Sequence, residues 1–263
     1  MRDDGYHAPA PDFSSFQKGY DQGQPQLVYR RFAGDLDTPV SAYLKLTQDQ
    51  DDSFLLESVE GGENLGRYTT IGMRPDLIWR AQGQKAEINR EAQNHPYIFK
   101  EDPLPTLASL KAVLEASKID VDPELAHRLP PMAAGLFGYF GYDFVRLTEH
   151  LPDRPPSPFD VPDGYFVRPT LLAIFDHVKR EVVLITPVRP DAGPEGKKDA
   201  KIAYDEASDI LSNALHALRQ PLAEKDEAKD LTAPEFTSNI LPTDYENIVL
   251  KAKDYIAAGD IFQ

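Results

Sequence analysis

The segment Ser53–Tyr68 combines residue types that can hold a small zwitterion. Its apolar run ends at Glu57 and Ser58, and Arg67 follows after a stretch that contains glycines. A carboxylate can hold an ammonium group, while a hydroxyl or a backbone group can bind a carboxylate. The segment could therefore receive an amino acid at a strand end. The alternative, which the residues alone favour, is a strand that ends in a polar turn with Arg67 pairing with Glu57 on the surface.

Other patterns that carry chemistry are missing from the sequence. The six histidines are scattered, and no pair has the spacing of a metal site on one helix. The sequence contains no cysteine, which excludes a disulfide or a thiol nucleophile within these residues. Gly135, Gly138 and Gly141 lie among aromatic residues but form no dinucleotide-binding motif, which needs a strand, a turn and a helix in order. We expect these glycines to let a buried strand pass close to another backbone.

The composition predicts a folded, soluble protein. The 263 residues are 41% hydrophobic, which can supply a substantial core. The formal net charge of −15 argues against nucleic-acid binding, because proteins that bind phosphate backbones carry basic patches. No apolar run has the length of a membrane span, and Met1–Tyr20 lacks the apolar stretch of a signal peptide. We therefore expect a cytoplasmic protein with neither nucleic acid nor membrane as a partner.

Short runs rich in β-branched and aromatic residues predict strands. In the first part of the chain these runs predict an antiparallel meander of Val40–Leu46, Ser53–Ser58, Tyr68–Met73, Leu77–Ala81 and Lys85–Asn89. Further on, Pro169–Val178 and Glu181–Val188 predict a hairpin that turns at Lys179 and Arg180.

Apolar residues at helical spacing predict three helices. The first is Leu104–Lys118, with Leu107, Leu110, Val113 and Leu114 on one side, and the second has Tyr204, Ala207, Leu211, Ala214 and Leu218 on one face. The third is Thr243–Gly259, with Thr243 and Glu246 as a capping box and Gly259 in the left-handed position that ends a helix. Asp260–Gln263 then reads as the start of a strand, so we expect this chain to be the front part of a longer protein.

Composition also divides the chain into regions. Residues 1–26 are polar and predict a loosely ordered leader, while residues 27–219 hold most of the predicted strands and helices. Leu151–Gly164 is rich in proline and predicts a surface loop. Residues 220–237 are acidic and predict a linker before a further domain that starts within residues 238–263.

Four stretches of the sequence resemble one family. Ser53–Tyr68, together with Thr38–Leu46, resembles the N-terminal region of anthranilate synthase component I. Gly135–Arg146, followed by Leu151 and Pro152, agrees with that family, and Asp254–Gln263 resembles the opening of its chorismate-binding domain. Four matching stretches in the right order are far more specific than any one of them. The chain is therefore identified as a member of this family.

The resemblance implies an α+β fold in which two large antiparallel sheets pack as a sandwich with helices outside. Residues 27–219 would be the N-terminal regulatory domain, and residues 238–263 would begin the catalytic domain. The implied reaction converts chorismate and ammonia to anthranilate and pyruvate, the first step of tryptophan biosynthesis, with tryptophan as feedback inhibitor. A glutamine amidotransferase subunit, component II, would supply the ammonia. Mg²⁺ would bind the chorismate carboxylate through acidic residues downstream of this chain.

The resemblance also assigns roles to single residues. Ser58 is the best candidate for a tryptophan contact, with Leu56 and Glu57 beside it. Pro39 and Arg67 are weaker candidates, because the intervening loop varies in length among relatives. Gln263 resembles the position at which enzymes that add water to chorismate carry a lysine base. A glutamine cannot take a proton as lysine can, which suits a reaction whose nucleophile is ammonia.

Two alternatives stay open at this point. The first is aminodeoxychorismate synthase component I, which uses the same substrates, although the TPVSAY and LLESVEGGE stretches favour the anthranilate enzyme. The second is a chain that works alone as an amino-acid-binding regulatory module. Its unfinished end argues against that reading, because an exposed, half-built domain would be unstable.

Overall fold

The structure is a computed structural model that describes residues 8–48, 50–60, 64–152, 156, 159–190, 196–222, 233 and 235–263. The chain separates into two compact units, Met1–Ala223 and Glu224–Gln263. None of the helices in the described ranges has the length and apolar character that a membrane crossing needs.

One eight-stranded antiparallel sheet forms the first unit. Its strands are β1 (Gln26–Ala33), β2 (Phe54–Glu60), β3 (Asn64–Gln82), β4 (Lys85–Asn89), β5 (Lys100–Glu101), β6 (Phe137–Phe140), β7 (Gly164–Asp176) and β8 (Glu181–Val188). They run in the order β1-β8-β7-β3-β4-β5, while β2 pairs with β3 and β6 pairs with β7. The β7–β8 hairpin and the strands predicted over Ser53–Ser58 and Lys85–Asn89 are confirmed.

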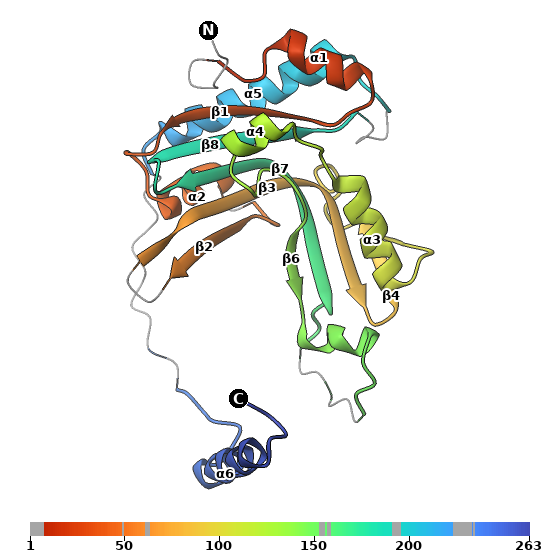
Figure 1. The fold of residues 1–263 in the computed structure, drawn as a ribbon, viewed down its shortest axis with the longest axis vertical. Helices are drawn as coiled ribbons and strands as arrows, with labels where there is room; N and C mark the ends of the chain where they lie inside the picture. Colours follow the sequence, from red (N-terminus) through yellow and green to blue (C-terminus); the bar gives the residue numbers. More distant parts are fainter. Residues whose placement is uncertain are drawn as a thin grey trace. The chain divides into compact units, whose positions relative to one another are not determined.

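Strands β3 and β7 run through both halves of this sheet. Strands β2 and β8 pair with one end of the two long strands, and β4 and β6 pair with the other end. Between the halves, the pairing of β3 with β7 shifts by one residue, because Asp76 is inserted between the pairs Pro75–Pro169 and Leu77–Arg168. Arg74 beside it has a left-handed φ of 54°. Both strands bend at this corner (Figure 1).

The α+β class is therefore confirmed, but the sheet arrangement differs from the expected sandwich. The described residues form one curled antiparallel half-barrel rather than two packed sheets. The reason is that the runs Tyr68–Met73 and Leu77–Ala81, predicted as separate strands, belong to the single strand β3. The bulge at Asp76 bends the strand without ending it.

Helices cover the faces of the sheet. In the first unit these helices are α1 (Phe13–Asp21), α2 (Pro39–Thr47), α3 (Thr106–Ser117), α4 (Pro123–Arg128), the short 3-10 helix η1 (Tyr142–Leu147) and α5 (Ala200–Leu218). Helix α6 (Pro242–Ala258) belongs to the second unit. Helices α1, α2 and α5 pack on one face of β1, β8, β7 and β3 around a core that includes Phe16, Ile71, Leu184 and Leu211. The opposite face of the same strands carries Tyr29, Leu172 and Ile185, covered by residues from 129 to 134.

The predicted strand over Val40–Leu46 is wrong, because these residues form helix α2. Thr38 caps the helix: its Oγ1 accepts a hydrogen bond from the Ser41 N–H at 3.1 Å, and the Ser41 Oγ accepts one from the Thr38 N–H at 3.0 Å. Pro39 fits the first turn, where no N–H is needed. Apolar residues alternate here as in a strand, yet the buried ones are Ala42 and Leu46, four residues apart, as a helix requires.

Helix α1 lies in a segment expected to be loosely ordered. Its N-cap Asp12 accepts a hydrogen bond from the Ser15 N–H at 2.8 Å. Phe16 and Tyr20 lie one turn apart, are buried, and stack with ring centroids 5.1 Å apart. The expectation of loose order before Leu27 is therefore wrong for the described residues from Ala8 onward. Two aromatic residues at helical spacing outweigh the polar composition around them.

Helix α3 is confirmed, but the face predicted for it is only partly right. Val113 is buried, whereas Leu107 and Leu114 are more than 40% exposed. Polar residues take their place against the sheet: Ser109 accepts a hydrogen bond from Trp79 Nε1 at 3.0 Å, and Thr106 donates one to the Gly83 carbonyl at 2.7 Å. Buried hydroxyls are tolerated because each has a partner.

The two later helices agree with the sequence in part. Helix α5 buries the predicted positions Ala207, Leu211, Ala214 and Leu218. Helix α6 in the second unit ends as predicted at Gly259, with a φ of 82°. Its N-cap is Leu241 without a side-chain hydrogen bond, so the capping box predicted at Thr243 is wrong. Asp260–Gln263 is irregular, so the strand predicted there is wrong as well.

The glycine-rich stretch contains one close approach of two backbones. A Cβ on Gly138 would lie 1.9 Å from the Tyr165 carbonyl oxygen of β7, so only glycine fits at this position of β6. The expected close approach is confirmed, although β6 is largely exposed rather than buried. Most of the predicted linker, residues 223–232 and 234, lies outside the described residues, as do 153–155 and 157–158 of the proline-rich loop.

Candidate functional site

Strand β2 places the main candidate residues next to one another on an exposed part of the sheet. Leu56 pairs with Thr70 and Glu57 pairs with Thr69 in β3. Leu55 packs against the core beneath α2, whereas Leu56 is 47% exposed and Glu57 and Ser58 are exposed. Among the described strands, β2 pairs with β3 alone. Because successive side chains of a strand point to opposite faces, Leu56 and Glu57 offer an apolar side chain and a carboxylate on different faces of β2, and Ser58 adds a hydroxyl at the next position.

An irregularity in β3 fixes the position of Ser58. The register shifts between the pairs Glu57–Thr69 and Val59–Leu65, so residues 66–68 of β3 lie opposite Ser58 alone. A Cβ on Gly66 would lie 2.4 Å from both Cβ and Oγ of Ser58. Ser58 thus rests directly on the backbone of Gly66, which no other residue type would allow. Bulges commonly re-aim a side chain in this way. Residues 61–63 of the motif lie outside the described residues.

Arg67 pairs with Asp176 rather than with Glu57. Its Nη2 lies 3.0 Å from Asp176 Oδ2, and its Nε lies 3.3 Å from both carboxylate oxygens. The guanidinium also lies over the Tyr68 ring, 4.8 Å from the centroid. The surface pair expected between Glu57 and Arg67 is therefore wrong. Because Asp176 holds it, the Arg67 guanidinium has fewer donors left for a ligand.

Asp176 is a buried, hydrogen-bonded carboxylate that the sequence patterns did not single out. Its side chain is 1% exposed and accepts hydrogen bonds from the N–H groups of Val178 at 3.1 Å and Lys179 at 3.0 Å as well as from Arg67. Burial would raise the pKa of this carboxyl, but the hydrogen bonds from Arg67 and the Lys179 backbone outweigh it and lower the pKa. An aspartate just before the predicted hairpin turn was the available signal, since aspartate often binds turn N–H groups.

The remaining candidates are not brought to Ser58 by a described contact. Pro39 is half-buried at the start of α2, a helix that packs against both β2 and β3. Tyr43 of α2 joins the start of β2 through a 2.9 Å hydrogen bond between its hydroxyl and Ser53 Oγ. Gln263 is exposed and belongs to the second unit.

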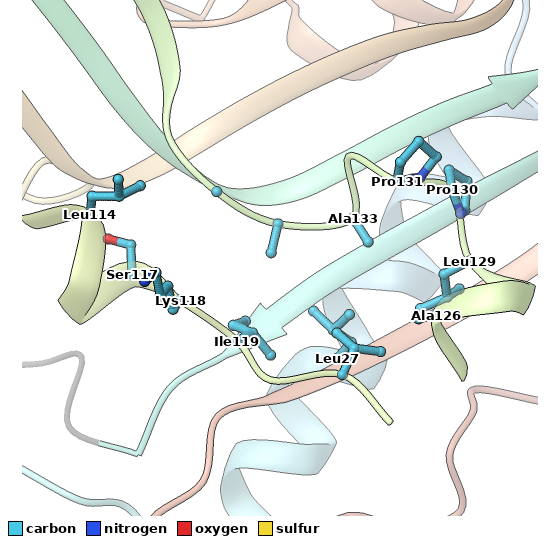
Figure 2. A pocket seen from close by; sticks show the side chains of 13 residues that line it. Leu27, Leu114, Ser117, Lys118, Ile119, Ala126, Leu129, Pro130, Pro131 and Ala133 are labelled. Atoms are coloured by element: carbon cyan, nitrogen blue, oxygen red, sulfur yellow. The ribbon is translucent and has the colours of Figure 1, made fainter. Parts of the chain in front are cut away.

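The described residues contain no group of three or more histidine, aspartate or glutamate side chains able to hold a metal ion. Cavities occur elsewhere in the first unit. One of about 330 Å³ lies between the ends of α3 and α4 and strand β1, and mostly apolar side chains such as Leu27, Ile119 and Leu129 line it (Figure 2). Its lining offers little chemistry beyond the binding of an apolar group.

The comparison with protein families decides the classification. Residues 51–263 match the family described as chorismate binding enzymes. The chain belongs to this family. The match includes both the β2–β3 segment and the whole of α6.

Individual relatives agree with the family match. The chain is 45% identical over 252 residues, 95% of its length, to the anthranilate synthase component 1 of Cereibacter sphaeroides, and 36% identical over 265 residues to that of a Synechocystis species. These matches cover 49% and 50% of the two relatives, so the chain spans about half the length of the curated relatives it matches. The solved structure of anthranilate synthase component I from Streptococcus pneumoniae shares the fold, with a TM-score of 0.53 and 23% identity over 87% of this chain and 45% of that one. The expected resemblance is confirmed.

We predict that Asp176→Asn lowers the free energy of unfolding by about 1.5–3 kcal/mol at neutral pH, the usual contribution of hydrogen bonds to a charged group. A carboxyl whose pKa is lowered on folding stabilises the protein above its unfolded pKa of about 3.9 and loses that contribution as the pH falls through its folded pKa. Urea unfolding at several pH values should therefore show a difference between wild type and variant that is constant above about pH 5 and shrinks below pH 4.

Asp205→Asn is the matched control, because Asp205 pairs with Lys201 on the exposed surface of α5. That change should alter the free energy of unfolding by less than about 0.5 kcal/mol. Equal losses in the two variants would show that Asp176 is no more than a surface charge.

Proposed function

We propose that this chain is the regulatory half, with the beginning of the catalytic half, of an anthranilate synthase component I. The whole enzyme converts chorismate and ammonia to anthranilate and pyruvate. The observation that carries this proposal is the 45% identity to the Cereibacter sphaeroides protein over 95% of the chain, which includes both units. In the whole protein the second sheet of the implied sandwich would come from residues that this chain lacks.

Strand β2 is the proposed site of feedback inhibition by tryptophan. The amino acid carries one ammonium and one carboxylate, and Glu57 and Ser58 supply a carboxylate and a hydroxyl from adjacent positions. Leu56, 47% exposed beside them, gives the indole an apolar surface. Pro39 and Arg67 are proposed as outer contacts, since α2 packs on β2 and β3 and Arg67 flanks Ser58 on the opposite strand.

Two further components belong to the proposal. A glutamine amidotransferase subunit, component II, supplies ammonia, and Mg²⁺ serves as the cofactor. The described residues offer no cluster of side chains that fits Mg²⁺, so its ligands would lie in another part of the whole protein. We propose no nucleic-acid partner, because the net charge of −15 opposes binding to a phosphate backbone.

A chimera tests the activity. Residues 1–263 are fused to the part of the Cereibacter sphaeroides relative that its match with this chain leaves uncovered, and the chain alone serves as the comparison. With chorismate, ammonium and Mg²⁺, we expect the chimera to release fluorescent anthranilate and the chain alone to release none. A folded chimera that makes aminodeoxychorismate, or Mg²⁺-dependent anthranilate from the chain alone, would contradict the proposal.

Ser58→Ala in the active chimera tests the inhibitor site. The variant removes a hydrogen bond to a charged ligand, worth about 1.5–3 kcal/mol, so the tryptophan concentration for half inhibition should rise roughly tenfold to a hundredfold. The chorismate reaction without tryptophan should stay largely unchanged. Ser212→Ala on the exposed face of α5 is the control and should leave inhibition as it is. An inhibition curve that Ser58→Ala does not move would remove this residue from the site.

Gln263 is proposed to help exclude water as the nucleophile. In Gln263→Lys an amine can act as a base, provided that its surroundings lower its pKa towards neutrality. We expect a small amount of hydroxylated chorismate product beside anthranilate when products of the folded chimera are separated by chromatography. Loss of anthranilate without any product derived from water would show that Gln263 has a structural role instead.

A further inference from the structure

A second cavity lies beside the corner of the sheet, and none of the residues that line it belongs to the segment Ser53–Tyr68. It has a volume of about 420 Å³. The end of β8 forms one wall with Thr186, Val188 and Arg189, and helix α5 forms another with Ala203, Ala207 and Ile210. The cavity therefore has a largely apolar wall that faces a polar one, and its volume is within the range of small-molecule sites.

Two side chains on this wall carry polar atoms that have no hydrogen-bond partner among the described residues. Thr186 is 3% exposed, and its Oγ1 has no hydrogen-bond partner among the described residues. Arg189 Nε and Nη1 are buried and also have none among those residues. Buried polar groups are nearly always hydrogen-bonded, so two unsatisfied side chains at one cavity need a physical reason. A bound molecule that accepts hydrogen bonds would supply it.

The Arg189 guanidinium is held in place from its other side. Its Nη2 donates to the carbonyl oxygen of Ser117 at 3.2 Å, and Ser117 Oγ accepts a hydrogen bond from Arg168 Nη1 at 3.3 Å. Ser117 ends helix α3 and also borders the apolar cavity described above (Figure 2). Arg189 is thus fixed at one nitrogen, while its other two nitrogens have no partner in the part of the chain that the structure describes.

Asp76, the carboxylate whose charge acts on Arg189, is already engaged by a different arginine. Asp76 binds Arg168 through both oxygens, at 2.7 Å from Nε and 3.0 Å from Nη2. Burial, together with the positive charge of Arg168, lowers the pKa of Arg189 to about 10, although Asp76 opposes the shift. A buried cation without its own counter-ion is costly, and an anion in the cavity would remove that cost.

We propose that this cavity binds a small organic carboxylate, whose two oxygens accept hydrogen bonds from Arg189 and Thr186 and whose apolar body packs against α5. A guanidinium fork matches the geometry of a carboxylate. A phosphate would bring more negative charge to a cavity that Asp76, Glu91 and Glu206 already border. The single negative charge of a carboxylate matches the single positive charge of Arg189.

Benzoate is the probe for the test, and its neutral analogue benzamide is the control ligand. The 263-residue chain is titrated with each by calorimetry, and the arginine Nε–H and threonine methyl signals are followed by NMR. We expect saturable benzoate binding that shifts the signals of Arg189 and Thr186, with much weaker binding of benzamide. Arg189→Met should weaken benzoate binding by about tenfold or more, and Thr186→Val should weaken it by a smaller factor.

Lys198→Met is the matched protein control. Lys198 borders the same cavity, but its ammonium group already binds Glu206 at 2.8 Å, so benzoate affinity should not change. Thermal unfolding checks that the variants fold.

Three results would overturn the proposal: no saturable benzoate binding by the wild-type chain, equally tight binding of benzamide, or benzoate affinity that Arg189→Met and Thr186→Val leave unchanged. The first two need no variant. Binding of inorganic phosphate without binding of benzoate would overturn the assignment of a carboxylate. None of these measurements depends on anthranilate synthesis, so their outcome is independent of the proposed enzyme activity.

Discussion

The buried ion pair between Asp76 and Arg168 is the interaction on which the shape of the first unit depends. Asp76 is the extra residue that shifts the register of β3 against β7, and Arg168 follows the shift on the opposite strand. Both carboxylate oxygens bind the guanidinium, at 2.7 and 3.0 Å. The pair therefore closes the irregular point of the sheet with directed hydrogen bonds, which replace the ladder bonds that a bulge disrupts.

The bend at this pair divides the sheet of the first unit into two regions. Before the bend, β3 pairs with β2 and contacts α2; after it, β3 pairs with β4 and contacts α3. The candidate inhibitor site lies on the first part, and the Arg189 cavity lies at the bend itself. Asp76 binds Arg168 and cannot also neutralise Arg189. The ion pair at the bend therefore leaves one buried cation, Arg189, without a carboxylate of its own among the described residues. Removing one partner of a buried ion pair costs far more stability than replacing both partners with apolar residues. Single substitutions of Asp76 or Arg168 should therefore be poorly tolerated.

The sequence predicts local elements well and the bend poorly, for physical reasons. Strand β4 and the β7–β8 hairpin follow from alternation and turn residues, and the buried stripe of α5 follows from helical spacing. Helix α2 was missed because its alternating apolar residues imitate a strand, while the capping by Thr38 and Ser41 decides for a helix. The curl could not be foreseen, since it depends on a contact between Asp76 and Arg168, which are remote in sequence. The same holds for Asp176 and Arg67, whose pairing replaced the local pair expected with Glu57.

Because Arg67 pairs with Asp176 rather than with Glu57, it is less available as a ligand contact beside β2. An amino-acid carboxylate that recruited Arg67 would have to share its guanidinium with Asp176, whose side chain is 1% exposed. If a ligand took Arg67 away, the N–H groups of Val178 and Lys179 would be the remaining described partners of the buried Asp176 carboxylate. The free energy lost in this way exceeds what a single contact with a surface ligand supplies. Ser58 carries no such cost, because it packs against the backbone of Gly66 and is an exposed residue. A ligand at this strand would therefore gain more from Ser58 and the neighbouring Glu57 than from the only arginine of the motif.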